Sequence, residues 1–260
     1  MKIPSGLLVL LLSGAAAAAL PATSQAAAVP RAAPRWPDSL DAFRLCISNQ
    51  PLLGVRNDAS GLTADPSGGW WLVSNQPLAA LRYSQDFSQL LQVVELPGVE
   101  DPEAIAWTGP GQLAVSEETR YIVRVSVPPA PPLVSRVAST VLINSLARGV
   151  VRQVNKGFEG LAYDPSGPWF YVAQLLFNGT GLGLKDFSEL SCWGPACESL
   201  LILSQGSKRI LRVDLQGKVL SSLKLKGLPR PEGLAVSADG RWMAVASEPN
   251  AFSLYSSSGC

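Results

Sequence analysis

The chain has 260 residues, and its 21 lysines and arginines nearly balance its 20 aspartates and glutamates. With 47% hydrophobic and 16% charged residues it has the composition of a folded protein, and its charge balance gives no reason to expect a nucleic-acid partner. It contains no histidine. This excludes Ser-His-Asp and Cys-His catalysis, imidazole metal ligands and histidine pH switches. Carboxylates, amides, hydroxyls, lysine, tyrosine or a hard metal ion remain for any chemistry.

The N-terminus has the pattern of a secretory signal peptide. Lys2 precedes an apolar run from Leu7 to Leu20, and small residues follow up to Ala28. The run is shorter than the roughly 20 apolar residues that cross a bilayer, so we expect export rather than a membrane span in the mature chain. The expected location is periplasmic, extracellular or envelope-associated, or lumenal in a eukaryote. We assign residues 1–28 to the signal peptide, 29–39 to an Ala/Pro-rich linker and 40–260 to the folded domain.

The four cysteines make an even set, as expected for disulfides in an oxidising compartment. Cys192 and Cys197 flank a Trp-Gly-Pro-Ala turn, which favours a bond between them across the neck of a hairpin. Half of a metal site is the alternative for this pair, but no second pair or histidine completes one. Cys46 and Cys260 lie at the two ends of the domain, and a bond between them would join the termini.

One sequence pattern occurs five times: an acidic or polar residue, then Gly, Leu or Ile, Ala, a turn and an apolar strand. The five segments are residues 58–74, 101–116, 157–173, 186–204 and 230–247. Their Asp-Pro-Ser-Gly and Ala-Asp-Gly turns favour β-hairpins. We therefore expect each unit to begin as strand, turn and strand, and Arg209–Asp214 and Val219–Leu225 to supply two further strands of one unit.

The spacing of these repeats predicts an all-β fold, a β-propeller. The aligned positions 61, 104, 160, 189 and 233 are 43, 56, 29 and 44 residues apart, a mean of 43. Four short strands at that period are typical of a propeller blade. We predict about five blades, with six as the alternative, and a shortened third blade because 29 residues are too few for four strands. The strand near 45–47 should share a blade with the chain's end and close the ring.

Two sets of polar residues are candidates for a site at the central channel. The first set precedes the repeated Gly position and contains Ser60, Glu103, Glu159, Ser188 and Glu232. The second follows the second strand of each unit and contains Asn75, Glu117, Gln174, Gln205 and Glu248. Unpaired carboxylates in one ring repel, so we expect a bound cation or a raised pKa. Oxygen ligands favour Ca²⁺ or Mg²⁺ over zinc. Alternatively, each glutamate accepts hydrogen bonds from turn amides as a repeated structural feature.

Asn178 begins an Asn-Gly-Thr sequon, which is an N-glycosylation acceptor only in a host that glycosylates exported proteins.

These motifs resemble the SdiA-regulated (YjiK-like) family of exported β-propellers. The resemblance runs from about Asp58 to Phe252, and its motifs are Ser60-Gly61-Leu62, Val73-Ser74-Asn75-Gln76-Pro77, Leu96-Pro97-Gly98, Asp101-Pro102-Glu103, Ser116-Glu117-Glu118, Gly157-Phe158-Glu159-Gly160-Leu161-Ala162-Tyr163, Pro231-Glu232-Gly233 and Ser247-Glu248-Pro249-Asn250. It implies a propeller that is commonly envelope-associated and has no firmly established activity.

The chain departs from the family pattern in two places. Residues 174–185 replace a Lys-Glu-rich stretch and a strand pair that are usual in the third blade, and Glu189 stands where glycine is usual. The residue before Gly-Leu-Ala is also similar in position to a metal ligand of the gluconolactonase-like calcium propellers.

Three hypotheses for function follow. The first is a non-enzymatic, exported propeller, expected to be monomeric, that binds a small ligand or an envelope protein at the channel mouth and contains a Ca²⁺ site. The alternative is a calcium-dependent ester or lactone hydrolase in which Glu103, Glu159 and Glu232 hold the metal and a metal-bound water attacks. A purely structural envelope scaffold is the second alternative.

Overall fold

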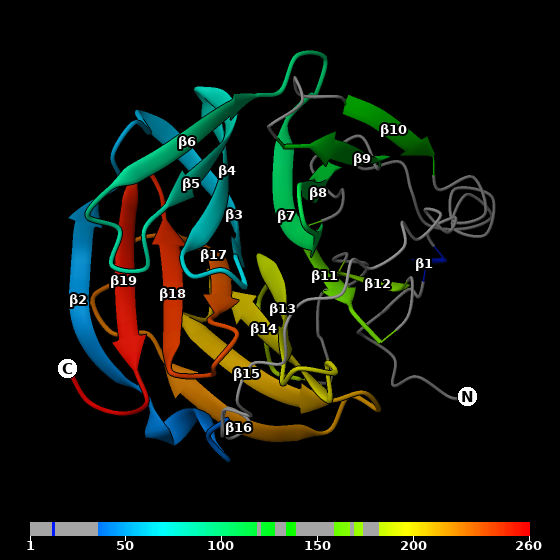
Figure 1. Ribbon diagram of the computed structural model, residues 1–260. Helices are drawn as coiled ribbons and strands as arrows, with labels where there is room; N and C mark the ends of the chain where they lie inside the picture. Colours follow the sequence, from blue (N-terminus) through cyan, green and yellow to red (C-terminus); the bar gives the residue numbers. More distant parts are fainter. Residues whose placement is uncertain are drawn as a thin grey trace, which may run out of the picture.

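The computed structural model describes residues 12–13, 36–118, 121–127, 134–138, 159–166, 169–173 and 182–260. Antiparallel sheets are arranged around a central axis (Figure 1). The first unit contains β3 (Asn57–Ala64), β4 (Trp70–Gln76), β5 (Leu78–Tyr83) and β6 (Leu90–Glu95). The second contains β7 (Pro102–Gly109), β8 (Gln112–Glu117), β9 (Tyr121–Ser126) and β10 (Val134–Ala138). The prediction of an all-β propeller is confirmed.

The third unit is smaller than its neighbours. It contains β11 (Gly160–Asp164) and β12 (Trp169–Ala173), with the two-residue β1 (Leu12–Ser13) paired to β12. Cleavage of a signal peptide where we predict it would remove β1. The fourth unit contains β13 (Glu189–Trp193), β14 (Ser199–Ser204), β15 (Arg209–Asp214) and β16 (Val219–Lys224). The fifth contains β17 (Pro231–Val236), β18 (Trp242–Ser247), β19 (Ala251–Ser256) and β2 (Arg44–Pro51).

The predicted number of blades needs correction. We predicted about five, whereas the described residues form four complete four-stranded blades and the smaller third unit, with no sixth sheet. The reason lies in the short repeat interval: residues 182–188, which lead directly into β13, contain no strand. The third unit therefore has an inner hairpin but lacks two outer strands of its own among the described residues.

The first strands of the five units surround the axis. Around the ring, β3 packs on β7, β7 on β11, β11 on β13, β13 on β17, and β17 returns to β3. The strands approach closely because of the repeated glycine. A Cβ added to Gly61 would lie 2.5 Å from Ala104 Cα, and one added to Gly160 would lie 2.5 Å from Leu190 N. A side chain at either position would push the neighbouring strand away.

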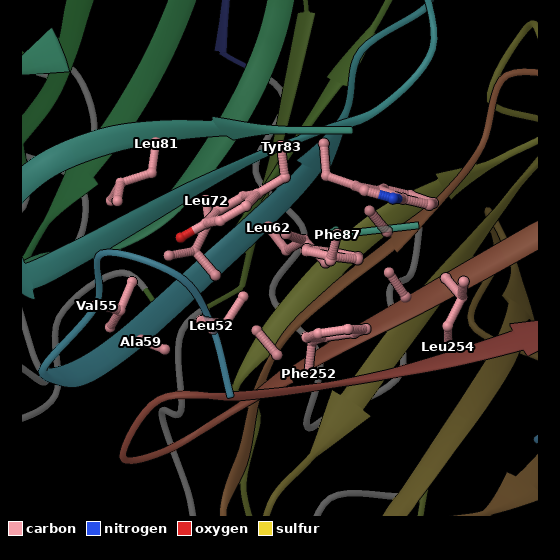
Figure 2. Packing of buried hydrophobic residues seen from close by; sticks show 14 of the residues in the cluster. Leu52, Val55, Ala59, Leu62, Leu72, Leu81, Tyr83, Phe87, Phe252 and Leu254 are labelled. Carbon is pink, nitrogen blue, oxygen red and sulfur yellow. The ribbon is translucent and has the colours of Figure 1, made fainter. Parts of the chain in front are cut away.

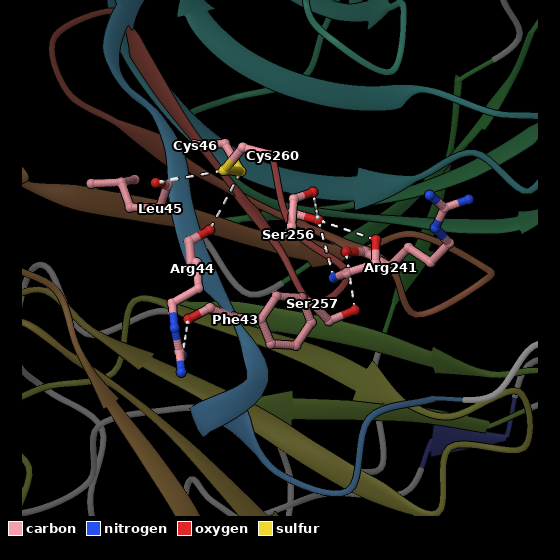
Figure 3. Close-up of a disulfide and its surroundings, with 10 residues drawn as sticks. Phe43, Arg44, Leu45, Cys46, Arg241, Ser256, Ser257 and Cys260 are labelled. Atoms are coloured by element: carbon pink, nitrogen blue, oxygen red, sulfur yellow. Dashed lines mark hydrogen bonds between the residues drawn. A yellow bond between two sulfur atoms is a disulfide. The ribbon is translucent and has the colours of Figure 1, made fainter.

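The ring closes where the N-terminal strand β2 pairs with β19 at the C-terminal end of the chain (Figure 1). A disulfide joins Cys46 to Cys260, with a Cα–Cα distance of 5.5 Å, and Figure 3 shows it beside β2. This confirms the predicted closure and resolves the disulfide connectivity. In the chain-entropy description a bond that closes a loop of 214 residues stabilises the fold by about 5 kcal/mol.

Hydrophobic packing between units builds the core. Leu62, Leu72 and Leu81 come from neighbouring strands of the first unit and face the fifth unit (Figure 2). Phe87 stacks on Phe252 with a ring centroid distance of 4.3 Å. Each such buried side chain contributes about 1.5–3 kcal/mol, so the interfaces between units rather than single sheets stabilise the propeller.

The folded part begins before the predicted boundary. Trp36 lies edge-on to Trp193, 5.5 Å between ring centroids. Arg212 lies 4.6 Å over the Trp193 ring and donates a 2.7 Å hydrogen bond to the Asp38 carbonyl. The 3₁₀ helix η1 (Leu40–Ala42) follows, capped by Ser39. Residues 36–39, which we assigned to the linker, thus pack on the fourth unit.

Candidate functional site

The first set of candidate residues lies at one end of the inner strands. Ser60 is in β3, Glu103 and Glu232 are the second residues of β7 and β17, and Glu159 and Ser188 directly precede β11 and β13. Because these strands surround the axis, the five residues stand at the same end of the inner strands, and we call this end the channel mouth. The glutamates lie close enough that Glu159 and Glu232 both raise the pKa of Glu103.

Glu103 and Glu159 are half-buried carboxyls without a hydrogen-bond donor among the described residues. Burial raises the pKa of Glu103 to about 8, and repulsion from Glu159 adds to it. Burial likewise raises the pKa of Glu159 to about 8, with added repulsion from Glu118 and Glu232. Neither side chain accepts a hydrogen bond from a turn amide in the described part of the chain, which does not support the alternative that each glutamate is a repeated acceptor for turn amides.

Glu232 differs because the fourth unit supplies it with donors. The Gln205 side-chain amide donates to Glu232 Oε1, and the Ser188 hydroxyl bonds the same carboxyl. Burial raises the pKa of Glu232 to about 7, while the Ser188 hydrogen bond lowers it and nearby Glu248 raises it. The Ser188 hydroxyl also accepts the Gln205 backbone N–H at 3.3 Å. One member of each predicted set therefore positions Glu232.

The residues of the second set differ in burial and in hydrogen-bond partners, although their positions in the repeat are equivalent. Glu117 is fully buried, and its Oε1 accepts the Glu100 backbone N–H at 2.9 Å. Glu248 pairs with Arg230 at 2.7 Å. Asn75 is half-buried near the end of β4. Gln174 and the sequon residue Asn178 lie outside the described residues.

Sequence reasoning missed Asp186. Its carboxyl accepts the Gly206 backbone N–H at 2.7 Å and a hydrogen bond from the Ser204 hydroxyl. Its charge raises the pKa of both Glu159 and Glu232. The repeat contains a pattern that could have identified this residue. In three units an aspartate stands two residues before the first-set position, as Asp58, Asp101 and Asp186.

The sequence identified Glu189 only as a glutamate at a position where glycine is usual in the family. It did not predict the buried location of its side chain. The side chain is fully buried, and its carboxyl accepts backbone N–H groups from Leu62, Leu161 and Leu190. Burial raises the pKa of Glu189 well above its usual value, and the three N–H donors act in the opposite direction.

The donors at the mouth have the right chemistry for calcium but are not arranged as a finished metal site. Carboxylate, amide and hydroxyl oxygens are the ligands that Ca²⁺ prefers. Within the described part of the chain, however, no three Asp, Glu or Cys side chains converge closely enough to hold one metal ion. The carboxyls instead stand separately around the axis.

The second disulfide is also as predicted. Cys192 bonds Cys197 across the turn between β13 and β14, with a Cα–Cα distance of 4.8 Å.

No helix among the described residues is long and apolar enough to cross a membrane.

The fold and motifs agree with comparison to known proteins. The model of the SdiA-regulated family matches residues 38–175 and 178–256, most of the chain. This chain belongs to the SdiA-regulated family. The match begins within the segment that packs on the fourth unit and ends with β19, so the SdiA-regulated region and the propeller coincide.

Two solved structures share the fold at low sequence identity. The PQQ-bound aldose sugar dehydrogenase of Streptomyces coelicolor is 13% identical, with a TM-score of 0.51 over 85% of this chain and 99% of that one. The glutaminyl cyclase of Myxococcus xanthus is 16% identical, with a TM-score of 0.53 over 82% of this chain and 96% of that one. At such identities the likeness extends to the propeller fold alone.

Proposed function

We propose that this protein is an exported binding module that takes a cationic ligand at the channel mouth. The observation that supports it is the state of Glu103 and Glu159, two half-buried carboxyls that receive no hydrogen bond from the described residues. Buried polar groups are normally satisfied within the fold, and exceptions concentrate where a ligand binds. A cation or a cationic amine would supply the missing partner. The two disulfides fit folding in an oxidising compartment.

Binding of a cation at this mouth should release protons. The pKa values of about 8 for Glu103 and Glu159 keep both carboxyls largely protonated at neutral pH. A positive ligand favours the ionised form and displaces those protons. Proton release therefore distinguishes binding at the mouth from binding at exposed surface carboxylates.

The separate placement of the carboxyls favours an extended organic cation or a protein's basic side chain. Calcium remains the inorganic candidate, since its coordination is flexible and accepts waters alongside carboxylates. Because no three carboxyls of the described residues converge on one point, one or two of Glu103, Glu159 and Glu232 would hold the ion, and waters would complete its coordination.

Calorimetric titration tests this proposal. We would titrate CaCl₂ and, separately, putrescine as a diammonium probe, at pH 7 in two buffers of different ionisation enthalpy. Saturable binding with release of about one to two protons is expected. Glu159→Gln should weaken binding about tenfold or more, while Glu95→Gln, on the outer strand β6, should leave it unchanged. If neither probe saturates, or Glu159→Gln changes nothing, the proposal fails and the structural scaffold gains support.

A hydrolase is the second candidate, because a carboxyl with a pKa near 8 can serve as a general acid or base at neutral pH. Lactones and aryl esters should be assayed in calcium and in EDTA. Turnover that requires calcium and is lost in Glu159→Gln would replace the binding-module proposal with the enzymatic one.

A further inference from the structure

Glu189 reaches across the propeller axis. Its Oε1 accepts the N–H groups of Leu161 at 3.2 Å and of Leu190 at 3.0 Å, and its Oε2 accepts the N–H of Leu62 at 3.2 Å. Glu189 lies on β13, while Leu62 lies on β3. These two strands are not neighbours in the ring, because β17 separates them on one side and β7 and β11 on the other. The carboxyl therefore lies at the centre of the five inner strands.

The three N–H groups are equivalent by the repeat. Leu62, Leu161 and Leu190 each follow the repeated position, which is Gly61 in the first unit, Gly160 in the third and Glu189 in the fourth. Backbone N–H groups that converge on one point form a concave site for an anion or another strong acceptor. The repeat thus builds such a site from the inner strands of different units.

Of the five aligned positions, 189 is the one with a side chain longer than a methyl group, since the others are Gly61, Ala104, Gly160 and Gly233. At Gly61 and Gly160 an added Cβ would lie 2.5 Å from the backbone of the neighbouring inner strand, so no side chain fits there. At position 189 the glutamate side chain extends inward and is fully buried. Glu189 belongs to the fourth unit. Its carboxyl bonds the third unit at Leu161 and the distant first unit at Leu62.

We propose that the inner-strand N–H groups form an axial carboxylate-binding site, which Glu189 occupies as a built-in ligand and through which it joins the incomplete third unit to the first and fourth. The absence of two further outer strands from the third unit, among the residues that the structure describes, and the glutamate at a position where glycine is usual are then connected. An inner hairpin with little sheet behind it gains an attachment at the axis. This inference does not depend on ligand binding at the channel mouth.

Chemical rescue tests the site. Glu189→Ala removes the carboxyl and leaves three buried N–H groups without acceptors, so the melting temperature should fall by roughly 10 °C. Formate, a free carboxylate without a side chain, should then bind in the vacated position. At ten times its dissociation constant, formate should raise the variant's melting temperature by about 3–5 °C beyond its effect on the wild type.

Leu203→Ala is the matched control. Leu203 is fully buried on β14 and lies opposite Glu189 in the sheet register, so its loss leaves a cavity lined by apolar groups. Formate should stabilise this variant no more than the wild type. Equal stabilisation of all three proteins by formate would be a general salt effect and would overturn the proposal.

A second measurement covers the case in which Glu189→Ala does not fold. In ¹⁵N-labelled protein, Glu189→Gln keeps the size of the side chain but replaces one acceptor oxygen by an N–H donor. The amide signals of Leu62, Leu161 and Leu190 should shift together, although they lie in three different units. A shift confined to Leu190 and its chain neighbours would contradict a shared axial site.

Discussion

Two kinds of buried glutamate lie near the axis of this propeller. Glu103 and Glu159 at the mouth receive no donors from the described residues, while Glu189 at the centre accepts three backbone N–H groups. Burial is the largest cause of a raised pKa at all three. The difference is whether the fold itself supplies partners. A satisfied carboxyl stabilises the structure, whereas an unsatisfied one is available to a ligand.

Glu232 is intermediate between the two. It has side-chain donors, Gln205 and Ser188, rather than backbone ones, and its pKa of about 7 is the lowest of the three mouth glutamates. Side-chain donors can rearrange when a ligand arrives, whereas the inner-strand amides are fixed by the sheet. This ordering of the four glutamates gives three tests.

The largest effect on stability should come from Glu189→Gln, compared with the same exchange of carboxyl for amide at Glu103. Glu189→Gln turns a donor toward the Leu62 N–H and should destabilise the protein by about 2–3 kcal/mol. Glu103→Gln removes a carboxyl that is hard to ionise and should be neutral or slightly stabilising at pH 8. Urea unfolding at pH 8 measures both. Equal losses from the two substitutions would remove the distinction between the sites.

An intermediate effect is expected from pH. Glu103 and Glu159 have folded-state pKa values of about 8 against 4.5 for the ordinary group. Between these values the unfolded chain loses protons that the folded one keeps, so stability should fall as pH rises from about 5 to 8 and then level off. After allowance for partial exposure we expect a loss of about 1–2 kcal/mol, smaller than that from Glu189→Gln.

The control for this pH effect is the double variant Glu103→Gln, Glu159→Gln, whose stability should vary less over the same range. Thermal unfolding at a series of pH values gives the comparison. A wild-type protein that becomes more stable between pH 5 and 8 would show that the mouth carboxyls are already satisfied.

The smallest effect should come from Ser188→Ala. The Ser188 hydroxyl lowers the pKa of Glu232, so its removal should raise that pKa by about half a unit to one unit. Carboxyl ¹³C shifts followed through a pH titration would report it. The pKa of Glu103, on which the charge of Glu232 has only a small effect, should change less than that of Glu232, and an equal change would mean that the two groups do not titrate separately.

Much of the fold followed from residues close together in sequence. The Gly-Leu-Ala repeat and its Asp-Pro-Ser-Gly turns predicted β-hairpins, because turn geometry and strand alternation depend on a few neighbouring residues. The spacing of Cys192 and Cys197 predicted their bond for the same reason. The 29-residue interval indicated a shortened third unit, but not that only four blades would be complete.

The sequence predicted the positions of the candidate site residues but not the hydrogen-bond partners of each carboxyl. The repeat placed Glu103, Glu159 and Glu232 at equivalent points, so their location at one end of the axis followed from the fold. Which of them would have donors did not follow. Gln205 reaches Glu232 because it follows β14, the strand next to β13, while Glu117 turns to a backbone N–H instead.

The sequence alone determined the propeller class, the absence of histidine chemistry, the disulfide candidates and the excess of carboxyl groups at repeated positions. Only the tertiary structure decided which glutamates have hydrogen-bond donors and where the side chain of Glu189 ends. The physical reason is distance along the chain. Leu62 and Glu189 are 127 residues apart and meet at the axis of the ring, so no local pattern encodes that contact.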